Sequence, residues 1–355
     1  MKVAQGAGAT RHWLSDHAML LRRGARRLVV GVTAVGKAPR RFDYFKALDV
    51  PGHDLLLLNS PGNGWYRQGV PLGGGPPSLA ATRGYLKALA EGYDEVAVLG
   101  GSMGAYGALL LGSAIPGARI LAMAPEVYGG LAGGAWVQFC TDPELPMSLS
   151  ALLADPGIEY MVVTGERNAA DLFCTAEVPR GRLITLRNGY HQVATVIAAE
   201  LGGIHRVVAP LLEGRLRQVL APLAGQMAQF PDLGAVMYLL EQRRLSPERA
   251  EAFLASLPPG FYGRAFLLLR VAQLQREAGN AFRALELATA ARALNPSDIE
   301  THLMHDRLWS DVHGAPPVPR FRDWLDPRFD GVVLYADQVA MLERLHGGKA
   351  VQAVG

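Results

Sequence analysis

One serine in this chain stands in a setting that could make it a nucleophile. In the segment Gly100-Gly101-Ser102-Met103-Gly104, glycines lie two residues before and two residues after the serine. A serine at a sharp turn between a strand and a helix projects its hydroxyl beyond the sheet, and flanking glycines leave room for that turn. The helix that follows would offer free N–H groups to a developing oxyanion. The pattern therefore predicts covalent catalysis through Ser102.

The residues on both sides of the motif supply the context that this turn needs. The preceding run, EVAVL at 95–99, is short and apolar, and the following segment, AYGALLL at 105–111, is rich in alanine and leucine. A strand, a glycine turn and a helix in this order resemble the nucleophile elbow of the α/β-hydrolase family. The resemblance covers residues 27–205, about half of the chain. A glycine-rich turn in another doubly wound fold is the alternative.

The family resemblance implies a serine, an acid and a histidine, in that order along the chain. His191 fits the histidine, because it follows LITL at 183–186, the last strand that we expect, and would lie above the serine. The other histidines fit less well. Four of them precede the serine or end the domain: His12, His17, His53 and His205.

The acid of the expected triad is harder to assign. In the commonest form of the family, an aspartate lies three residues after the glycine that ends the penultimate strand, but Asn168 holds that position in VVTGERNAADLF. Asp171 is our preferred acid because it is the only aspartate in this loop, and it would hold the imidazole tautomer and stabilise the imidazolium. Glu166 and Glu126, which follows the preceding strand, stay open as alternatives.

Two N–H groups are needed to stabilise the oxyanion. The geometry of the elbow gives the Met103 amide as one donor. We expect Ala34, in the loop after the strand at 27–32, to give the other, although the usual His-Gly start of that loop is missing.

Aromatic residues gather near the expected mouth of the site. They could bind an apolar substrate or stack on a sugar, and ordinary core packing explains them equally well. The residues that we predict to contact substrate are Trp65, Tyr66, Tyr106 and Tyr128, and Trp136 and Phe139 lie in the adjoining insertion. No metal or other cofactor is expected, because His302, His305 and Asp306 have helical spacing but no third cluster of ligands.

These residues require a sheet that positions them. Short, continuous apolar runs alternate with helical patterns over residues 27–205, as is typical of strands that are buried on both faces. We therefore expect an α/β fold with a doubly wound, mostly parallel sheet. The expected strands are 27–32, 54–58, 95–99, 119–123, 160–164 and 183–186. The expected helices are 78–92, 103–114, 147–154 and 190–200, and residues 126–157 form the longest irregular insertion.

Amphipathic helices replace the strands after residue 207. Residues 265–296 resemble one tetratricopeptide repeat, with a first helix to Glu277, a turn at Gly279-Asn280 and a second helix. We expect an α/β-hydrolase domain at 1–206, a tetratricopeptide-like all-α domain at 207–312 and a C-terminal extension at 313–355, with a strand at 331–335 and a helix at 337–346. One repeat cannot cover its own apolar faces, so the helical domain should pack on the first domain or on a second copy of the chain.

The bulk composition narrows the class of protein. The chain has 355 residues, of which 50% are hydrophobic and 19% charged, which indicates a globular protein of two domains. A net charge of +3 without a broad basic stripe does not suggest a nucleic-acid partner. Two cysteines make no disulfide framework, and the N-terminus lacks the apolar segment of a secretory signal, so we expect a cytoplasmic protein. The uncharged stretch 96–118 is interpreted as a strand, turn and helix, and not as a membrane span.

The combined features predict a serine hydrolase that cleaves an ester, such as an acyl or acetyl group on a small molecule or a carbohydrate. The same residues could transfer the acyl group to an acceptor other than water. The alternative from a different class is a catalytically inactive hydrolase-fold scaffold whose helical domain binds a protein partner.

Overall fold

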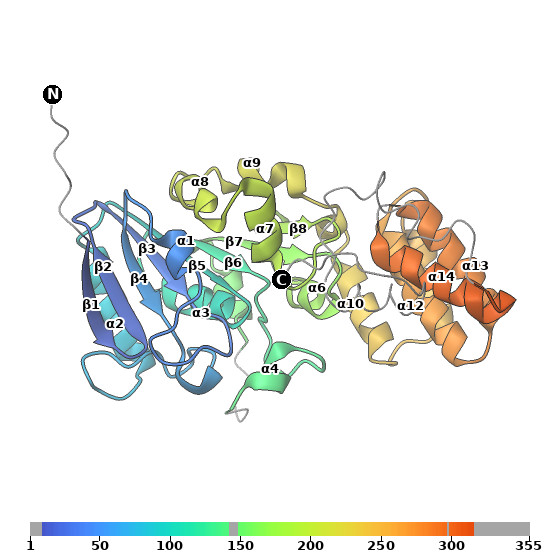
Figure 1. The fold of residues 1–355 in the computed structure, drawn as a ribbon, viewed down its shortest axis with the longest axis horizontal. Helices are drawn as coiled ribbons and strands as arrows, with labels where there is room; N and C mark the ends of the chain where they lie inside the picture. The colour runs from blue at the N-terminus through green and yellow to red at the C-terminus, as the bar shows by residue number, and fades with distance from the viewer. Residues whose placement is uncertain (1–8, 142–147, 297, 316–355) are drawn as a thin grey trace. The chain divides into compact units, whose positions relative to one another are not determined.

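The computed structural model describes residues 9–141, 148–296 and 298–315, and within it the chain divides into two compact units after Ala235 (Figure 1). The first unit is an α/β unit and the second is helical. Each unit is described by itself below.

The described part of the first unit contains an eight-stranded sheet with the order β1-β2-β4-β3-β5-β6-β7-β8. β1 and β2 form an antiparallel hairpin, β2 pairs antiparallel with β4, and all other neighbours are parallel. The strands are β1 Thr10–Ser15, β2 Ala18–Arg22, β3 Arg27–Val32, β4 Asp54–Leu58, β5 Glu95–Gly101, β6 Arg119–Met123, β7 Glu159–Gly165 and β8 Leu183–Leu186. The predicted α/β class and the predominantly parallel sheet are therefore confirmed.

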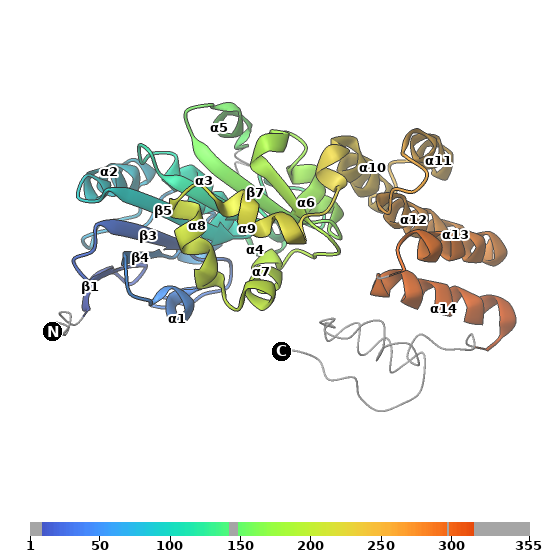
Figure 2. The same ribbon diagram turned by 90° about the horizontal axis from the view of Figure 1, so that it is seen from above.

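Helices cover both faces of this sheet, as Figure 2 shows for α2 and α5 on one side and α1 and α7 on the other. The first face carries α2 Leu79–Ala90, α3 Met103–Gly112, α4 Ala135–Phe139 and α5 Ser150–Ala154. The second carries α1 Phe45–Leu48, α7 Val193–Leu201, α8 Val208–Leu212 and α9 Leu216–Leu220. A further short helix, α6 Ala169–Cys174, follows β7. The strands between these two apolar cores are buried on both faces, which explains their continuous runs of Val, Ile and Leu.

Several expected elements differ in extent from those observed. The helix expected at 190–200 begins at Val193, so His191 lies in the turn before it. The insertion at 126–157 contains two short helices, α4 and α5, in its described part. The hairpin of β1 and β2 was not expected, because β1 is largely exposed and lacks an apolar run.

The chain after residue 206 continues to pack on the second face of the sheet. Val207, Leu211 and Leu220 are buried in the same core as β7 and β8. Further along, Leu186 forms an isolated antiparallel bridge with Ala224. The first compact unit thus includes the segment 207–235, which we had expected to belong to the helical domain.

The second unit consists of helices in its described part. α10 Pro231–Glu241 spans the division, and α11 Pro247–Ser256, α12 Gly263–Glu277, α13 Ala281–Leu294 and α14 Ile299–His313 follow. α12 and α13 pack together across a turn in which Gly279 has φ +85°, a conformation that favours glycine. The resemblance to a tetratricopeptide repeat stays a prediction, and the elements expected at 331–335 and 337–346 lie outside the described residues.

Among the described residues, no single helix has the length and apolar character needed to cross a membrane. One pair of helices, Val193–Leu201 and Ile204–Leu212, meets the requirement in length and composition only when the two are taken together, and they are bent by 87°.

Candidate active site

Ser102 occupies a strained turn between β5 and α3. Its backbone angles are φ 54° and ψ −123°, and it is the N-cap residue of α3. A non-glycine residue rarely adopts a positive φ, and such a conformation persists only where the surrounding structure enforces it. The Ser102 amide donates to the Met123 carbonyl of β6 at 2.9 Å, which fixes the end of the strand beside its neighbour.

The two motif glycines are required by close backbone contacts. A Cβ on Gly100 would lie 2.2 Å from the Gly104 carbonyl oxygen, and a Cβ on Gly104 would lie 2.2 Å from the Val32 carbonyl oxygen. Neither contact can be relieved by turning a side chain, because both partners are backbone atoms. The glycines therefore allow α3 to begin directly against β3 and β5.

His191 lies within hydrogen-bonding distance of the serine. Its Nε2 is 2.9 Å from the Ser102 hydroxyl, although the two residues are 89 positions apart in the sequence. The histidine reaches this position from the turn between β8 and α7, and its side chain is 33% exposed. With the proton on Nδ1, the ring accepts a hydrogen bond from the serine through Nε2.

Asp171 lies on the opposite edge of the imidazole. Both of its carboxylate oxygens are 2.9 Å from His191 Nδ1. The aspartate sits in the first turn of α6, and the Asn168 side chain caps this helix by accepting from the Asp171 amide at 3.0 Å. Asn168 thus positions the helix that carries Asp171.

Glu166, an alternative acid, is engaged elsewhere. Its Oε1 accepts from the Thr185 hydroxyl at 2.7 Å and from the Met227 amide at 2.8 Å. This buried carboxylate connects β8 to the segment that follows α9. The structure therefore brings Asp171, and not Glu166, next to His191.

Burial and charge shift the pKa values of the pair in a consistent way. Burial alone lowers the pKa of His191, but the hydrogen bond and charge of Asp171, with a smaller contribution from Glu126, raise it above its ordinary value. Burial raises the pKa of Asp171, and the hydrogen bond to His191 opposes that effect. The imidazolium is thus favoured in place, as a general base requires once it has accepted a proton.

Glu126 is a further buried carboxylate near the pair. Its Oε2 accepts from the Trp136 amide at 2.7 Å, while its Oε1 has no hydrogen-bond partner in the described part of the chain. Burial is the main cause that raises the pKa of Glu126 to about 7, and the charge of Asp171 adds to it. The charge of Glu126 therefore changes near neutral pH, and this charge acts on His191.

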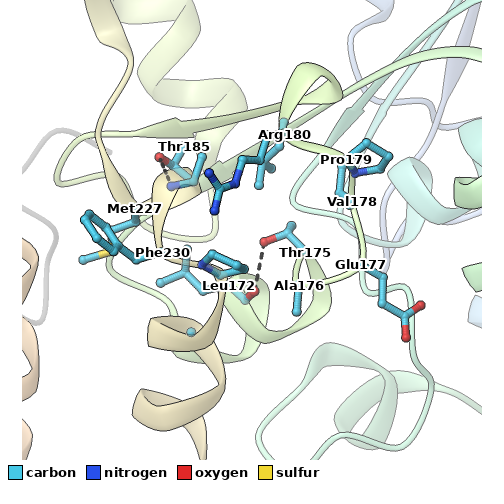
Figure 3. Close-up of a pocket in the computed structure, with 14 residues that line it drawn as sticks. Leu172, Thr175, Ala176, Glu177, Val178, Pro179, Arg180, Thr185, Met227 and Phe230 are labelled. Carbon is cyan, nitrogen blue, oxygen red and sulfur yellow. Dashed lines mark hydrogen bonds between the residues drawn. The ribbon is translucent and has the colours of Figure 1, made fainter. Parts of the chain in front are cut away.

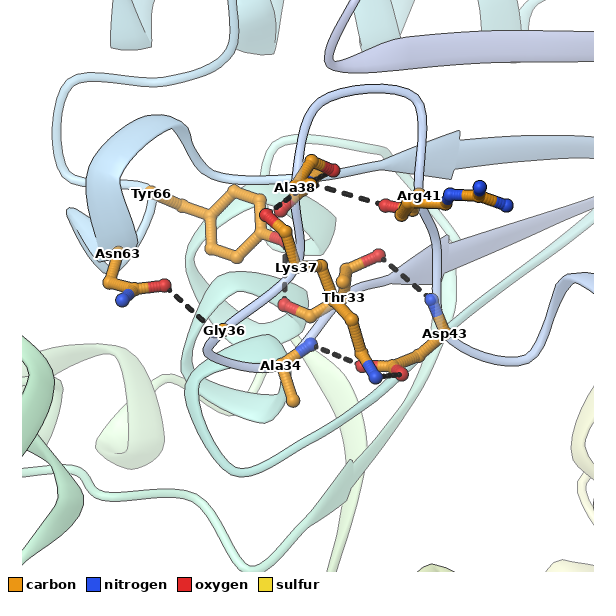
Figure 4. Close-up of polar contacts among 10 residues, drawn as sticks. Thr33, Ala34, Gly36, Lys37, Ala38, Arg41, Asp43, Asn63 and Tyr66 are labelled. Carbon is orange, nitrogen blue, oxygen red and sulfur yellow. Dashed lines mark hydrogen bonds and ion pairs between the residues drawn. The ribbon is translucent and has the colours of Figure 1, made fainter.

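The two predicted oxyanion donors have different surroundings. Met103 is the first residue of α3, where an amide has no intrahelical acceptor. The Ala34 amide, in contrast, donates to the Asp43 carboxylate at 2.9 Å, and Lys37 pairs with the other oxygen of that carboxylate at 3.1 Å (Figure 4). In this conformation, Ala34 does not offer its N–H to a ligand.

The loop that contains Ala34 is held by side chains from two other segments (Figure 4). The Asn59 amide lies within 3.2 Å of the carbonyl oxygens of Lys37, Ala38 and Arg41. The Tyr66 hydroxyl donates to the Thr33 carbonyl at 2.7 Å. The path of residues 33–44 is therefore defined by buried polar contacts.

The predicted substrate-contacting aromatics do not lie together at a surface. Trp65, Tyr66 and Tyr106 are 0% exposed and belong to the core on the α3 side of the sheet, so no substrate can reach them in this conformation. The Trp65 and Tyr106 rings pack on Trp136, at centroid distances of 5.0 and 6.5 Å. Tyr128 is half-buried and packs on Phe173 of α6, beside the helix turn that carries Asp171.

A separate pocket lies beside α6, β8 and the segment 227–234 (Figure 3). Leu172, Thr175, Arg180 and Met227 are among its lining residues, but none of the predicted site residues is. The Thr175 hydroxyl donates to the Leu172 carbonyl at 2.9 Å. The pocket is therefore distinct from the surroundings of Ser102.

Within residues 9–141, 148–296 and 298–315, no group of three or more His, Cys, Asp or Glu residues is arranged to hold a metal ion. Of the residues with helical spacing in the second unit, His302 has its Nε2 2.8 Å from the Pro296 carbonyl oxygen.

Sequence reasoning did not find two residues of the loop after β3. Asp43 contacts the Ala34 amide, and the Tyr44 hydroxyl would lie 2.7 Å from a Cβ built on Gly101, next to the serine. The only sequence signal was their position between an expected strand and an apolar segment. A contact made across a nine-residue loop has no periodicity that a sequence could display.

No protein-family model and no curated protein sequence matches this chain. Several solved structures are similar to parts of it. The capsule O-acetyltransferase of Neisseria meningitidis serogroup A is 16% identical, with 58% of this chain and 95% of that chain covered and a TM-score of 0.40. An esterase of Pyrococcus furiosus is 13% identical, with 61% and 93% covered and a TM-score of 0.36. A lidless α/β serine hydrolase of Xanthomonas campestris is 13% identical, with 63% and 98% covered and a TM-score of 0.32. Function is therefore inferred from the side chains of this chain.

Proposed function

We propose that this protein is a serine hydrolase that cleaves a carboxylic ester, such as an acyl or acetyl group on a small molecule or a carbohydrate. The observation that carries the proposal is the continuous contact from Ser102 through His191 to Asp171, with both contacts at 2.9 Å. A nucleophile next to a base, and a base oriented by an acid, is the arrangement that activates a serine.

The first half of the reaction forms an acyl-enzyme. Ser102 Oγ attacks the ester carbonyl carbon while His191 Nε2 takes the hydroxyl proton. The carbonyl π electrons move to oxygen, and the Met103 amide stabilises the resulting oxyanion. When the tetrahedral intermediate collapses, the C–O bond to the alcohol breaks, and the imidazolium returns its proton to the leaving alkoxide. Asp171 stays ionised and holds the ring in place.

The second half releases the acyl group. A water molecule attacks the acyl carbon while His191 Nε2 takes one of its protons. When the second intermediate collapses, the bond from the acyl carbon to Ser102 Oγ breaks, the imidazolium returns its proton to Oγ, and the acid is released. An alcohol that enters in place of water would receive the acyl group by the same steps. Both outcomes use the same three side chains and the Met103 amide.

A fluorophosphonate probe provides the direct test, because it forms a stable bond only with an activated serine. We expect the purified full-length chain to be labelled at Ser102 and to hydrolyse p-nitrophenyl acetate. Ser102→Ala should lose both properties, with a fall of about 10⁶-fold in kcat, and should keep its melting temperature. Esterase activity that survives in purified Ser102→Ala would rule out the proposed nucleophile.

A catalytically inactive scaffold that binds a protein partner through its helices is the second candidate. One observation favours it: the Ala34 amide is occupied by Asp43, so the loop after β3 does not supply an oxyanion donor through that residue. The same labelling experiment separates the candidates, because a scaffold with an unactivated serine would not react at a rate above that of Ser102→Ala.

A further inference from the structure

An open groove lies on the first unit between β1, the loop 40–44 and α1. Its volume is about 610 Å³, which is within the range of small-molecule sites. Its lining includes three aromatic side chains, Trp13, Phe42 and Phe45, and three cations, Arg11, Arg41 and Lys46. None of these residues was expected to contact substrate.

The groove has an excess of positive charge. Two further cations are neutralised: Arg40, which also lines the groove, pairs with Asp16 at 2.7 Å, and the nearby Lys37 pairs with Asp43 at 3.1 Å. In contrast, Arg11, Arg41 and Lys46 have no acidic partner in the part of the chain that the structure describes, and all three are exposed. Three unneutralised cations around one concave surface attract an anion.

The wall of the groove is apolar. Trp13 is 47% exposed, and its ring centroid is 6.1 Å from that of Phe42. The Arg11 guanidinium lies 5.2 Å from the centroid of the Phe45 ring. An exposed tryptophan beside cations suits a ligand that has an anionic group on an apolar body.

Two residues that line the groove also contact the surroundings of the nucleophile. Tyr44 lines the groove, and its hydroxyl would lie 2.7 Å from a Cβ on Gly101, the residue before Ser102. Asp43 also lines the groove, and its carboxylate accepts from the Ala34 amide at 2.9 Å. Tyr44 thus lies between the groove and the residue before Ser102, and Asp43 lies between the groove and the loop after β3.

We propose that this groove is the substrate-recognition site of the hydrolase and that it selects esters with an anionic group, a carboxylate, phosphate or sulfate, on an apolar body. Arg11, Arg41 and Lys46 bind the anionic group, and Trp13 with Phe42 contacts the apolar part. The inference rests on the proposed function, because it names the substrate class of the Ser102 site.

A matched pair of esters tests the selection. We compare kcat/KM for 1-naphthyl acetate and for the same ester with a sulfonate on the ring, using the full-length protein. We expect a preference of about tenfold for the sulfonated ester at low salt, mainly through KM, and a smaller preference at 0.5 M NaCl because salt screens exposed charges. In Arg41→Gln/Lys46→Gln, the ratio should fall to about twofold or less.

Lys87→Gln is the matched control, because Lys87 is an exposed cation on α2, which packs on the other face of the sheet. It should keep the tenfold ratio. Equal kcat/KM for the two esters in wild-type protein, or a preference that survives in the double variant, would refute the assignment of the groove as the substrate-recognition site. Neither result would contradict the proposed hydrolase activity.

A binding measurement separates this outcome from failure of the proposed function. Quenching of Trp13 fluorescence by 1-naphthyl phosphate, with Trp13→Phe as the background, reports the groove even if neither ester is cleaved. Suppose that 1-naphthyl phosphate quenches Trp13, that the double variant weakens this quenching by about tenfold, and that the wild-type protein shows no esterase activity and no labelling. This result would refute the hydrolase and the substrate assignment but not the anion site. Absence of any Trp13-dependent quenching would refute the anion site itself.

Discussion

Each compact unit contains a histidine next to an aspartate, and the two pairs differ in burial and in what surrounds them. In the first unit, His191 Nδ1 faces Asp171 and Nε2 faces the Ser102 hydroxyl, with the histidine side chain 33% exposed. In the second unit, His305 Nδ1 lies 3.3 Å from Asp306, and both side chains are 3% exposed. Burial of an ionisable pair therefore does not by itself identify a site.

The partner on Nδ1 explains the difference in chemistry. Arg292 lies 3.1 Å from His305 Nδ1, and because a guanidinium can only donate, that nitrogen must accept. His305 therefore has no Nδ1 proton for Asp306 in this arrangement, whereas His191 can donate to Asp171 and still accept from a serine. A catalytic pair needs a nucleophile on the free nitrogen and a path to solvent.

Matched histidine substitutions give the largest contrast. His191→Gln should reduce kcat for p-nitrophenyl acetate by about 10⁶-fold, because the serine loses its base. His305→Gln should leave kcat within about twofold and lower only the melting temperature. Steady-state kinetics and thermal unfolding of both variants check this, and comparable activity losses in the two would mean that the difference between the pairs is not chemical.

Substitution of the acid should have the next largest effect. Asp171→Asn should lower kcat by about 10⁴-fold, because the amide favours the wrong imidazole tautomer. Glu166→Gln is the control within the same loop, since that carboxylate bonds Thr185 and Met227 and should affect stability more than turnover. A crippled Glu166→Gln beside an active Asp171→Asn would reverse the assignment of the acid.

Two truncations sharpen the boundary between the units. A chain that ends at 206 lacks Val207, Leu211 and Leu220 and leaves exposed the apolar surface that they cover. The loss of each buried side chain should lower the free energy of unfolding by about 2 kcal/mol. We expect this chain to be insoluble or to melt far below the full-length protein, while a chain of residues 1–235 stays folded and retains esterase activity. A stable, active 1–206 would show that segment 207–235 adds little to the first unit.

The smallest effect is expected at Glu126. The pKa of Glu126 is about 7, and its carboxylate raises the pKa of His191 only at pH values where Glu126 is ionised. Glu126→Gln should therefore be a few-fold more active than wild type near pH 7, because more of the histidine is neutral there. The two pH profiles of kcat/KM should converge at low pH, where Glu126 is protonated, and at high pH, where His191 is neutral in both proteins. Profiles that coincide at pH 7 would exclude this coupling.

The sequence predicted the parts of the molecule that have a regular pattern. The strands at 27–32, 54–58, 119–123 and 183–186 have the predicted bounds, because a strand buried on both faces is a continuous apolar run. Ser102 and His191, predicted from motif and order, lie together in the structure, and so does Asp171.

The parts that were not predicted depend on contacts between distant residues. β1 is mostly exposed, so its alternation carries little apolar signal. Trp65 and Tyr66 are predicted to lie near the mouth because they follow a strand, and Tyr106 because it lies beside the elbow. The turn after β4 and helix α3 instead place these side chains in the core. The Ala34–Asp43 contact and the groove depend on the path of a loop, which Asn59 and Tyr66 fix from outside it.

The backbone of Ser102 also has a consequence for engineering. A non-glycine residue at φ 54° and ψ −123° is disfavoured by about 1–3 kcal/mol, against a total of about 5–15 kcal/mol for a folded domain. For the proposed nucleophile, thermostability and reactivity are therefore opposed, since glycine, which would relax the turn, lacks a hydroxyl. A search for more heat-resistant variants should hold residue 102 fixed and look for its gains in the surrounding sheet.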